Sequence, residues 1–332
     1  MSTVIVKEKV FKHFLDFPPE LRKMVIEEMQ PDSRCRFTRC SKLCYKEAKS
    51  SKNFVDKLQI FAISLNEIAI TVGYSIHKTI YGNGFMLKFE KEHGKKYMKY
   101  LRQGPGPNEK ELWRDELNDS ICLGTFSILH FRNMLKFYQN IIRRLEIKGP
   151  LFESIKPKNF DFGVNSLKNL EELKCEIGIL QFISKLRHPL KKLIHWGDEN
   201  FDIIRKYDQI YNVRNNLYIP YLTLNGDQFF RLSASIINIH IGELTVDDIC
   251  NFIKHWRSGK LRDNFQSCEW NLDSSGFDVL QLLERFGVQE NDEEEDFVKV
   301  KIKHDREVWK RAELFYFDSD RLLTFYVKIN DN

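Results

Sequence analysis

A recurring apolar spacing in the second half of the chain constrains its fold more than any other feature of the sequence. Each copy has one apolar residue, followed three and five positions later by two further residues of inward type. The copies are Ile142/Leu145/Ile147, Leu170/Leu173/Cys175, Leu190/Leu193/His195, Ile219/Leu222/Leu224, Ile236/Ile239/Ile241 and Phe265/Cys268/Trp270. Side chains alternate between the two faces of a strand, so the last two members of each copy point inward together. The pattern predicts a series of short strands that share one buried face.

This spacing resembles the L-x-x-L-x-L core of leucine-rich repeats. The middle members lie 28, 20, 29, 17 and 29 residues apart, so the longer intervals leave room for a helix. One such helix is expected over residues 244–256, where apolar residues recur at helical spacing and Thr245 can cap the first turn. The Asn that many such repeats carry after the strand is absent. We expect a degenerate leucine-rich-repeat-like solenoid, and chance matches to a loose pattern remain the alternative.

Further strands are predicted on both sides of this array. Apolar and polar residues alternate, as they do in strands, over residues 55–65, 67–76 and 84–92, and residues 81–85 have the composition of a turn. Residues 126–143 have the apolar spacing of a helix. At the C-terminus, the segments 296–304, 309–318 and 321–329 predict three antiparallel strands that would cap the array. The expected fold class is α/β, or α+β overall.

The N-terminal segment has the signals of short helices. Pro18 and Pro19 suit a helix start, and Leu21, Met24, Val25 and Met29 then recur on one helical face. Pro31 ends this helix, and a second apolar stripe runs from residue 35 to residue 44. A unit of about forty residues buries too little surface to be stable alone. It therefore needs a partner protein or its neighbouring domain, and a plain helical cap on that domain is the simpler interpretation.

Residues 14–55 resemble an F-box. The family opens with Leu-Pro-x-Glu-Ile/Leu, and this chain reads Phe17-Pro18-Pro19-Glu20-Leu21, with Arg39-Cys40-Ser41-Lys42 at the place of the Val-Cys/Ser-Lys ending. Phe17 and Cys35 replace the usual Leu, and the Trp common near the end is absent. The resemblance implies docking onto the Skp-type adaptor of a cullin-based ubiquitin ligase. The residues implied to face that adaptor are Pro18, Glu20, Leu21, Val25, Ile26 and Met29.

A second resemblance lies near the C-terminus. Residues 233–260 combine a strand with the helix sequence FIKHW and Gly259, and a charged hairpin follows over residues 302–317. This arrangement is similar to the F-box-associated domain of the F-box families expanded in nematodes, where that domain is taken to recruit substrates. The expected domains are an F-box-like module at 14–55, a linking β/α region at 56–140 and a substrate-binding, leucine-rich-repeat-like domain at 141–332.

The residues that carry chemistry show no catalytic or metal-binding pattern. The nine His lack HxH and HExxH spacing, and the seven Cys lack CxxC spacing. For His195, a hydrogen-bonded core histidine is favoured over a ligand. The acidic run from Glu290 to Asp296 is interpreted as a solvated loop, with a weak cation or basic-partner site as the alternative. We therefore expect no cofactor and no enzyme.

Charge and hydropathy limit which partners and which cellular compartment can be expected. The net charge of +5 resides in residues 1–60, which hold thirteen Lys or Arg and eight Asp or Glu, mostly at helical positions. A solvated helix face is favoured over nucleic acid binding. No signal core or membrane-length apolar run is found, so a cytoplasmic or nuclear protein is expected. The predicted function is a ligase adaptor that binds a protein target; the alternative is an interaction scaffold not connected with ubiquitin.

Overall fold

The computed structural model describes residues 14, 16–29, 37, 40–50, 55–64, 66–73, 84–103, 110–139, 141–148, 161–197, 201–272, 276–287, 297–307 and 310–329. The chain divides into two compact units, residues 1–170 (unit 1) and 171–332 (unit 2). This division differs from the expected boundary near residue 141. The physical reason is that β6 (Ile142–Lys148) pairs in parallel with β1 (Val55–Ser64), so it belongs to the sheet of unit 1.

Unit 1 contains short N-terminal helices and a mixed sheet. Its other elements are α2 (Pro19–Glu28), α4 (Lys42–Ser50), β2 (Glu67–Gly73), β3 (Gly84–Glu92), β4 (Lys95–Gln103), β5 (Lys110–Leu117) and α5 (Leu123–Tyr138). Within the unit, the strand order is β6-β1-β2-β3-β4-β5, and every pair except β1 with β6 is antiparallel. The predicted strands at 55–65, 67–76 and 84–92 and the predicted helix at 126–143 are therefore present with adjusted ends.

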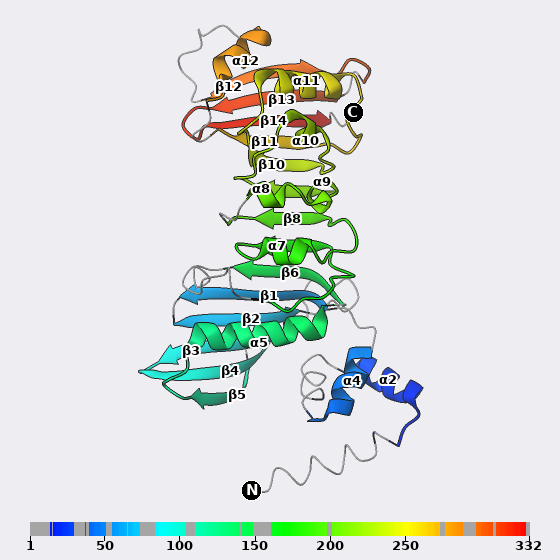
Figure 1. Cartoon of the computed structure of the whole chain (residues 1–332), viewed down its shortest axis with the longest axis vertical. Helices are drawn as coiled ribbons and strands as arrows, with labels where there is room; N and C mark the ends of the chain where they lie inside the picture. The colour runs from blue at the N-terminus through cyan, green and yellow to red at the C-terminus, as the bar shows by residue number, and fades with distance from the viewer. Residues whose placement is uncertain are drawn as a thin grey trace. The chain divides into compact units, whose positions relative to one another are not determined.

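Helix α5 covers one face of this sheet, across β1, β2 and β3 (Figure 1). Alternation along β3 explains the two faces. Phe89 points toward α5 and meets the ring of Phe126 edge-on at a centroid distance of 5.9 Å. Lys88 and Glu90 point to the opposite face, where they form an ion pair at 2.7 Å. One face is thus apolar and covered, and the other carries paired charges.

Unit 2 alternates strands with short helices. Its strands are β7 (Glu172–Cys175), β8 (Lys192–His195), β9 (Asn216–Ile219), β10 (Ile236–His240), β11 (Ser267–Asn271), β12 (Phe297–Lys303), β13 (Lys310–Phe317) and β14 (Leu322–Ile329). Its helices are α7 (Ile179–Ile183), α8 (Phe201–Ile204), α9 (Asp208–Tyr211), α10 (Gly226–Phe230), α11 (Val246–Arg257) and α12 (Val279–Arg285). The order is β12-β13-β14-β11-β10-β9-β8-β7; β7 to β11 are parallel, and β12, β13 and β14 add antiparallel.

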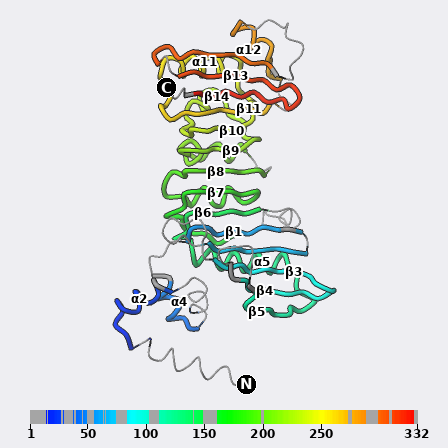
Figure 2. Tube along the Cα trace, turned by 180° about the vertical axis from the view of Figure 1, so that it is seen from behind, coloured from blue at the N-terminus to red at the C-terminus, as the bar shows by residue number. Residues whose placement is uncertain are grey.

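Two columns of buried side chains run across the strands of unit 2. The register places Leu173, Leu193, Leu217, Ile237, Cys268 and Phe325 in one column, and Cys175, His195, Ile219, Ile239, Trp270 and Leu323 in the other. The helices α7, α10 and α11 lie over this buried side (Figure 1), and Figure 2 presents the opposite face of the same strands.

The register corrects two copies of the predicted repeat. The inward pair of β9 is Leu217 and Ile219, and that of β10 is Ile237 and Ile239. Leu222 and Leu224, which the pattern assigned to a strand, follow β9 and are buried there. The middle positions 173, 193, 217, 237 and 268 are 20, 24, 20 and 31 residues apart, a more even spacing than the sequence pattern gave.

The expected solenoid is not confirmed, because the strands form a mixed α/β sheet rather than a solenoid. In a solenoid, each repeat stacks on its neighbour in the same way. Here the helices range from four residues in α8 to twelve in α11, and the sheet continues into antiparallel strands. The three antiparallel C-terminal strands are confirmed as β12, β13 and β14. The helix predicted at 244–256 is confirmed as α11, capped by Thr245.

Candidate functional site

Helix α2 of unit 1 has two different apolar faces. It begins at Pro19, and proline suits this position because the first residues of a helix do not need an N–H group for the helical hydrogen bonds. Residues three and four positions apart share a helical face, so Leu21, Met24 and Val25 lie together. Ile26 follows Val25 by one residue, which turns its side chain by about 100° to another side of the helix.

The Ile26 side of α2 forms the core of the N-terminal module. This core consists of Phe14, Ile26, Phe37, Cys44 and Ala48, with Met29 and Phe137 packed against it. The rings of Phe14 and Phe37 meet edge-on at 5.0 Å. An ion pair at 3.5 Å between Arg22 and Glu47 joins α2 to α4, and the Ser41 hydroxyl accepts the Cys44 N–H at 3.0 Å, which caps α4. The module is therefore held by its own core and by Phe137 of α5.

The other side of α2 is exposed. The exposed fraction is 46% for Leu21, 60% for Met24 and 40% for Val25, and Phe17 and Leu43 are exposed at 45% and 40%. We call Phe17, Leu21, Met24 and Val25 the docking face. Leu21, Met24 and Val25 lie on α2 and Phe17 just before it, and exposed apolar side chains gathered in this way make the face a candidate protein-binding surface.

The predicted adaptor-facing residues divide between these two sides. Pro18, Glu20, Leu21 and Val25 are exposed, whereas Met29 is half-buried and Ile26 is fully buried. Ile26 has no surface to offer a partner, because it completes the module's own core. Phe17 and Met24, which the predicted set did not include, are exposed as well, and the i, i+3, i+4 spacing of Leu21, Met24 and Val25 had already placed Met24 on the same helical face as Leu21 and Val25.

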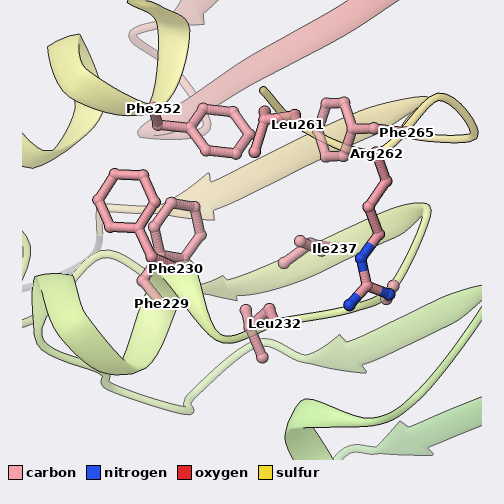
Figure 3. A pocket seen from close by; sticks show the side chains of 9 residues that line it. Phe229, Phe230, Leu232, Ile237, Phe252, Leu261, Arg262 and Phe265 are labelled. Carbon is pink, nitrogen blue, oxygen red and sulfur yellow. The ribbon is translucent and has the colours of Figure 1, made fainter. Parts of the chain in front are cut away.

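Unit 2 contains a small apolar pocket between α10, β10 and α11 (Figure 3). Its lining includes Phe229, Phe230, Phe252 and Phe265, and the guanidinium of Arg262 stands at its edge, where it donates to the Ser233 carbonyl at 2.8 Å. The cavity volume is about 30 Å³, compared with roughly 300–1,000 Å³ for typical small-molecule sites. The pocket is too small for a cofactor or a small-molecule substrate.

The remaining sequence features with chemical or membrane-binding potential can be placed in the structure one by one. His195 is fully buried in a column of unit 2, and its Nδ1 lies 2.9 Å from the carbonyl oxygen of Cys175. Among the residues with described positions, no three His, Cys, Asp or Glu gather to hold a metal ion. The acidic run from Glu290 to Asp296 falls outside the described residues. None of the helices in the described part of the chain has the length and apolar character needed to cross a membrane.

Comparison with known proteins assigns the N-terminal module. No curated protein and no solved structure matches the chain. The family model of the F-box domain matches residues 14–56, which include the docking face and the core around Ile26. Residues 14–56 are therefore an F-box domain.

Proposed function

We propose that this protein is the substrate-recognition adaptor of an SCF ubiquitin ligase, whose docking face binds a Skp-type adaptor while unit 2 holds a protein target. One observation carries the proposal: within the residues that match the F-box, Leu21, Met24 and Val25 stand exposed on a helix whose other side is packed. The resemblance of residues 233–260 to an F-box-associated domain supports a target-binding role for unit 2.

The physical driving force is burial of the docking face. Each of its side chains keeps about half of its surface in water, and removing that surface from water stabilises a complex by roughly 1 kcal/mol per side chain. A helix with apolar residues at i, i+3 and i+4 fits a hydrophobic groove. Ile26 acts from inside the module, because its packing against Phe14 and Phe37 holds α2 in position.

The proposal is tested by charge substitution on the docking face. The double substitution Leu21→Asp and Val25→Asp should weaken capture of a purified Skp-type adaptor at least about a hundredfold, since two carboxylates in an apolar groove cost several kcal/mol. Leu129→Asp is the matched control, because Leu129 is 44% exposed on helix α5 and should leave binding unchanged. Titration calorimetry with the 332-residue chain measures both affinities.

The choice of Leu21 and Val25 avoids a misleading result. Ile26→Asp would also abolish binding, but by placing a charge in the module's core. Circular dichroism should show that the Leu21/Val25 variant stays folded. Full binding by that folded variant would exclude the docking face, and no binding by the unsubstituted chain would favour an interaction scaffold not connected with ubiquitin.

A further inference from the structure

The three C-terminal strands of unit 2 present a basic face on the side away from the core. Val300, Leu314 and Phe325 lie in register and are buried. The alternate positions therefore point to the opposite face. They carry five cationic residues, Lys299, Lys301, Lys303, Arg311 and Lys328, around one carboxylate, Glu313. We call these six residues the basic sheet face.

Three of these cations lie side by side across the three strands. Lys303 of β12 is directly opposite Arg311 of β13, and Arg311 is directly opposite Lys328 of β14. Like charges directly opposite each other destabilise a sheet. Their position side by side, at the ends of the three strands, therefore costs stability unless an anion binds across them.

The single carboxylate of the face is already engaged. Glu313 forms ion pairs with Lys299 at 3.0 Å and with Lys328 at 2.6 Å. Burial alone would raise the pKa of Glu313, but these two ammonium groups lower it below its usual range, so it stays charged. Of the carboxylates in the described part of the chain, none pairs with Lys301, Lys303 or Arg311. Three cations thus remain available to an external anion.

Aromatic side chains beside these cations favour a polypeptide over a nucleic acid. Phe315 and Phe317 stack on each other at 6.1 Å, and the Lys299 ammonium lies 5.2 Å from the centre of the Phe315 ring. Nucleic acid bases need accessible ring faces on which to stack, and these faces are partly taken. Tyr326, which is 47% exposed beside Glu313, offers apolar surface to a side chain of a protein.

We infer that the basic sheet face binds an acidic segment of the target protein. Carboxylates of that segment would lie against Lys301, Lys303 and Arg311, where Arg311 can hold one in a bidentate pair. An apolar side chain of the segment would rest on Tyr326. This inference rests on the proposed function, because it names the class of target that the adaptor presents to the ligase.

The test measures, by fluorescence anisotropy, how tightly the 332-residue chain binds a labelled twelve-residue peptide of eight Glu and four Leu. A peptide with Gln in place of each Glu is the reference. The acidic peptide should bind, the Gln peptide should bind at least about tenfold more weakly, and Lys303→Glu with Arg311→Glu should weaken acidic-peptide binding by at least that factor. Lys254→Glu with Lys260→Glu changes the net charge equally at two exposed residues outside the basic sheet face, and should leave binding unchanged.

Three results would overturn the inference. The first is an equal loss of acidic-peptide affinity in the two charge-reversed variants, and the second is failure of the acidic peptide to bind. The third is that a twelve-nucleotide oligouridylate binds more tightly than the acidic peptide and loses this binding in the Lys303→Glu, Arg311→Glu variant. Capture of the Skp-type adaptor is measured on the same preparations and should be retained by both variants. Loss of peptide binding with adaptor capture intact therefore separates this inference from the proposed function.

Discussion

At the scale of single residues, Glu90 shows how a charged group stabilises unit 1. Its side chain is buried on β3, 2.7 Å from the Lys88 ammonium and paired also with Lys99. Burial alone would raise the pKa of Glu90, but hydrogen bonds from the two ammonium groups outweigh it and lower the pKa to about 2. A carboxyl with a lowered folded pKa stabilises the fold above its unfolded pKa of about 4.5, and this stabilisation is lost as the pH falls toward 2.

Replacing Glu90 by Gln should therefore lower the free energy of unfolding at pH 7 by roughly 2 kcal/mol. The difference from the unsubstituted chain should shrink as the pH falls from 4.5 toward 2, because the native carboxyl then becomes neutral as well. Urea titrations at pH 7, 4 and 2.5 measure it. Glu116→Gln is the control, since Glu116 is 53% exposed beside Lys95 and its loss should cost under about 1 kcal/mol. An equal difference at all three pH values would contradict the assignment.

Single residues also show what the sequence could not predict about the docking face. Helical spacing placed Leu21, Met24 and Val25 on one helical face, and the F-box resemblance added Ile26 to the adaptor-facing set. The pattern could not tell which apolar residues face inward, because Ile26 is buried by Phe14 and Phe37, which come from other segments. Only the packing of those segments separates the core side from the exposed side.

At the scale of elements, α11 is the clearest case of a structure determined by local sequence. The Thr245 hydroxyl accepts the Asp248 N–H at 3.2 Å, and Asp248 accepts the Thr245 N–H at 2.8 Å, a reciprocal capping box. The helix then packs Phe252 and Trp256 against Phe325, with ring centroids 5.8 and 5.3 Å away. The cap and the core contacts thus support the same helix.

Thr245→Ala should cost about 1 kcal/mol of stability, since it removes the side-chain acceptor at the N-terminus of α11. Thr245→Ser keeps that oxygen and should behave like the unsubstituted chain. Chemical denaturation followed by tryptophan fluorescence detects the change, because Trp256 and Trp270 are buried in unit 2. If the Ala and Ser variants were equally stable, the cap would contribute nothing measurable.

Other elements were beyond the sequence pattern for identifiable reasons. For β9, the sequence pattern selected Leu222 and Leu224, which are apolar and buried but follow the strand. The inward residues of β9 are identified only by its pairing with β10. Strands β4 and β5 were not predicted, since charged side chains occur on both of their faces and interrupt the apolar alternation. Those charges are satisfied across strands, as in the pair of Arg114 with Glu92 at 3.2 Å.

At the scale of the whole molecule, the docking face and the basic sheet face belong to different compact units. In the proposed adaptor role the protein supplies proximity, so both surfaces must be occupied together but need not influence each other. The F-box core packs against Phe137, which lies on α5 and belongs to the same unit, unit 1.

We therefore expect the two binding events to be energetically independent. Saturation with the Skp-type adaptor should change the dissociation constant of the acidic peptide by less than about twofold, and the Leu21/Val25 and Lys303/Arg311 variants combined should lose both activities additively. Anisotropy titrations with and without the adaptor measure the coupling. A shift of tenfold or more, about 1.4 kcal/mol, would mean that occupancy of the F-box alters unit 2, and the protein would then sense its ligase as well as bridge to it.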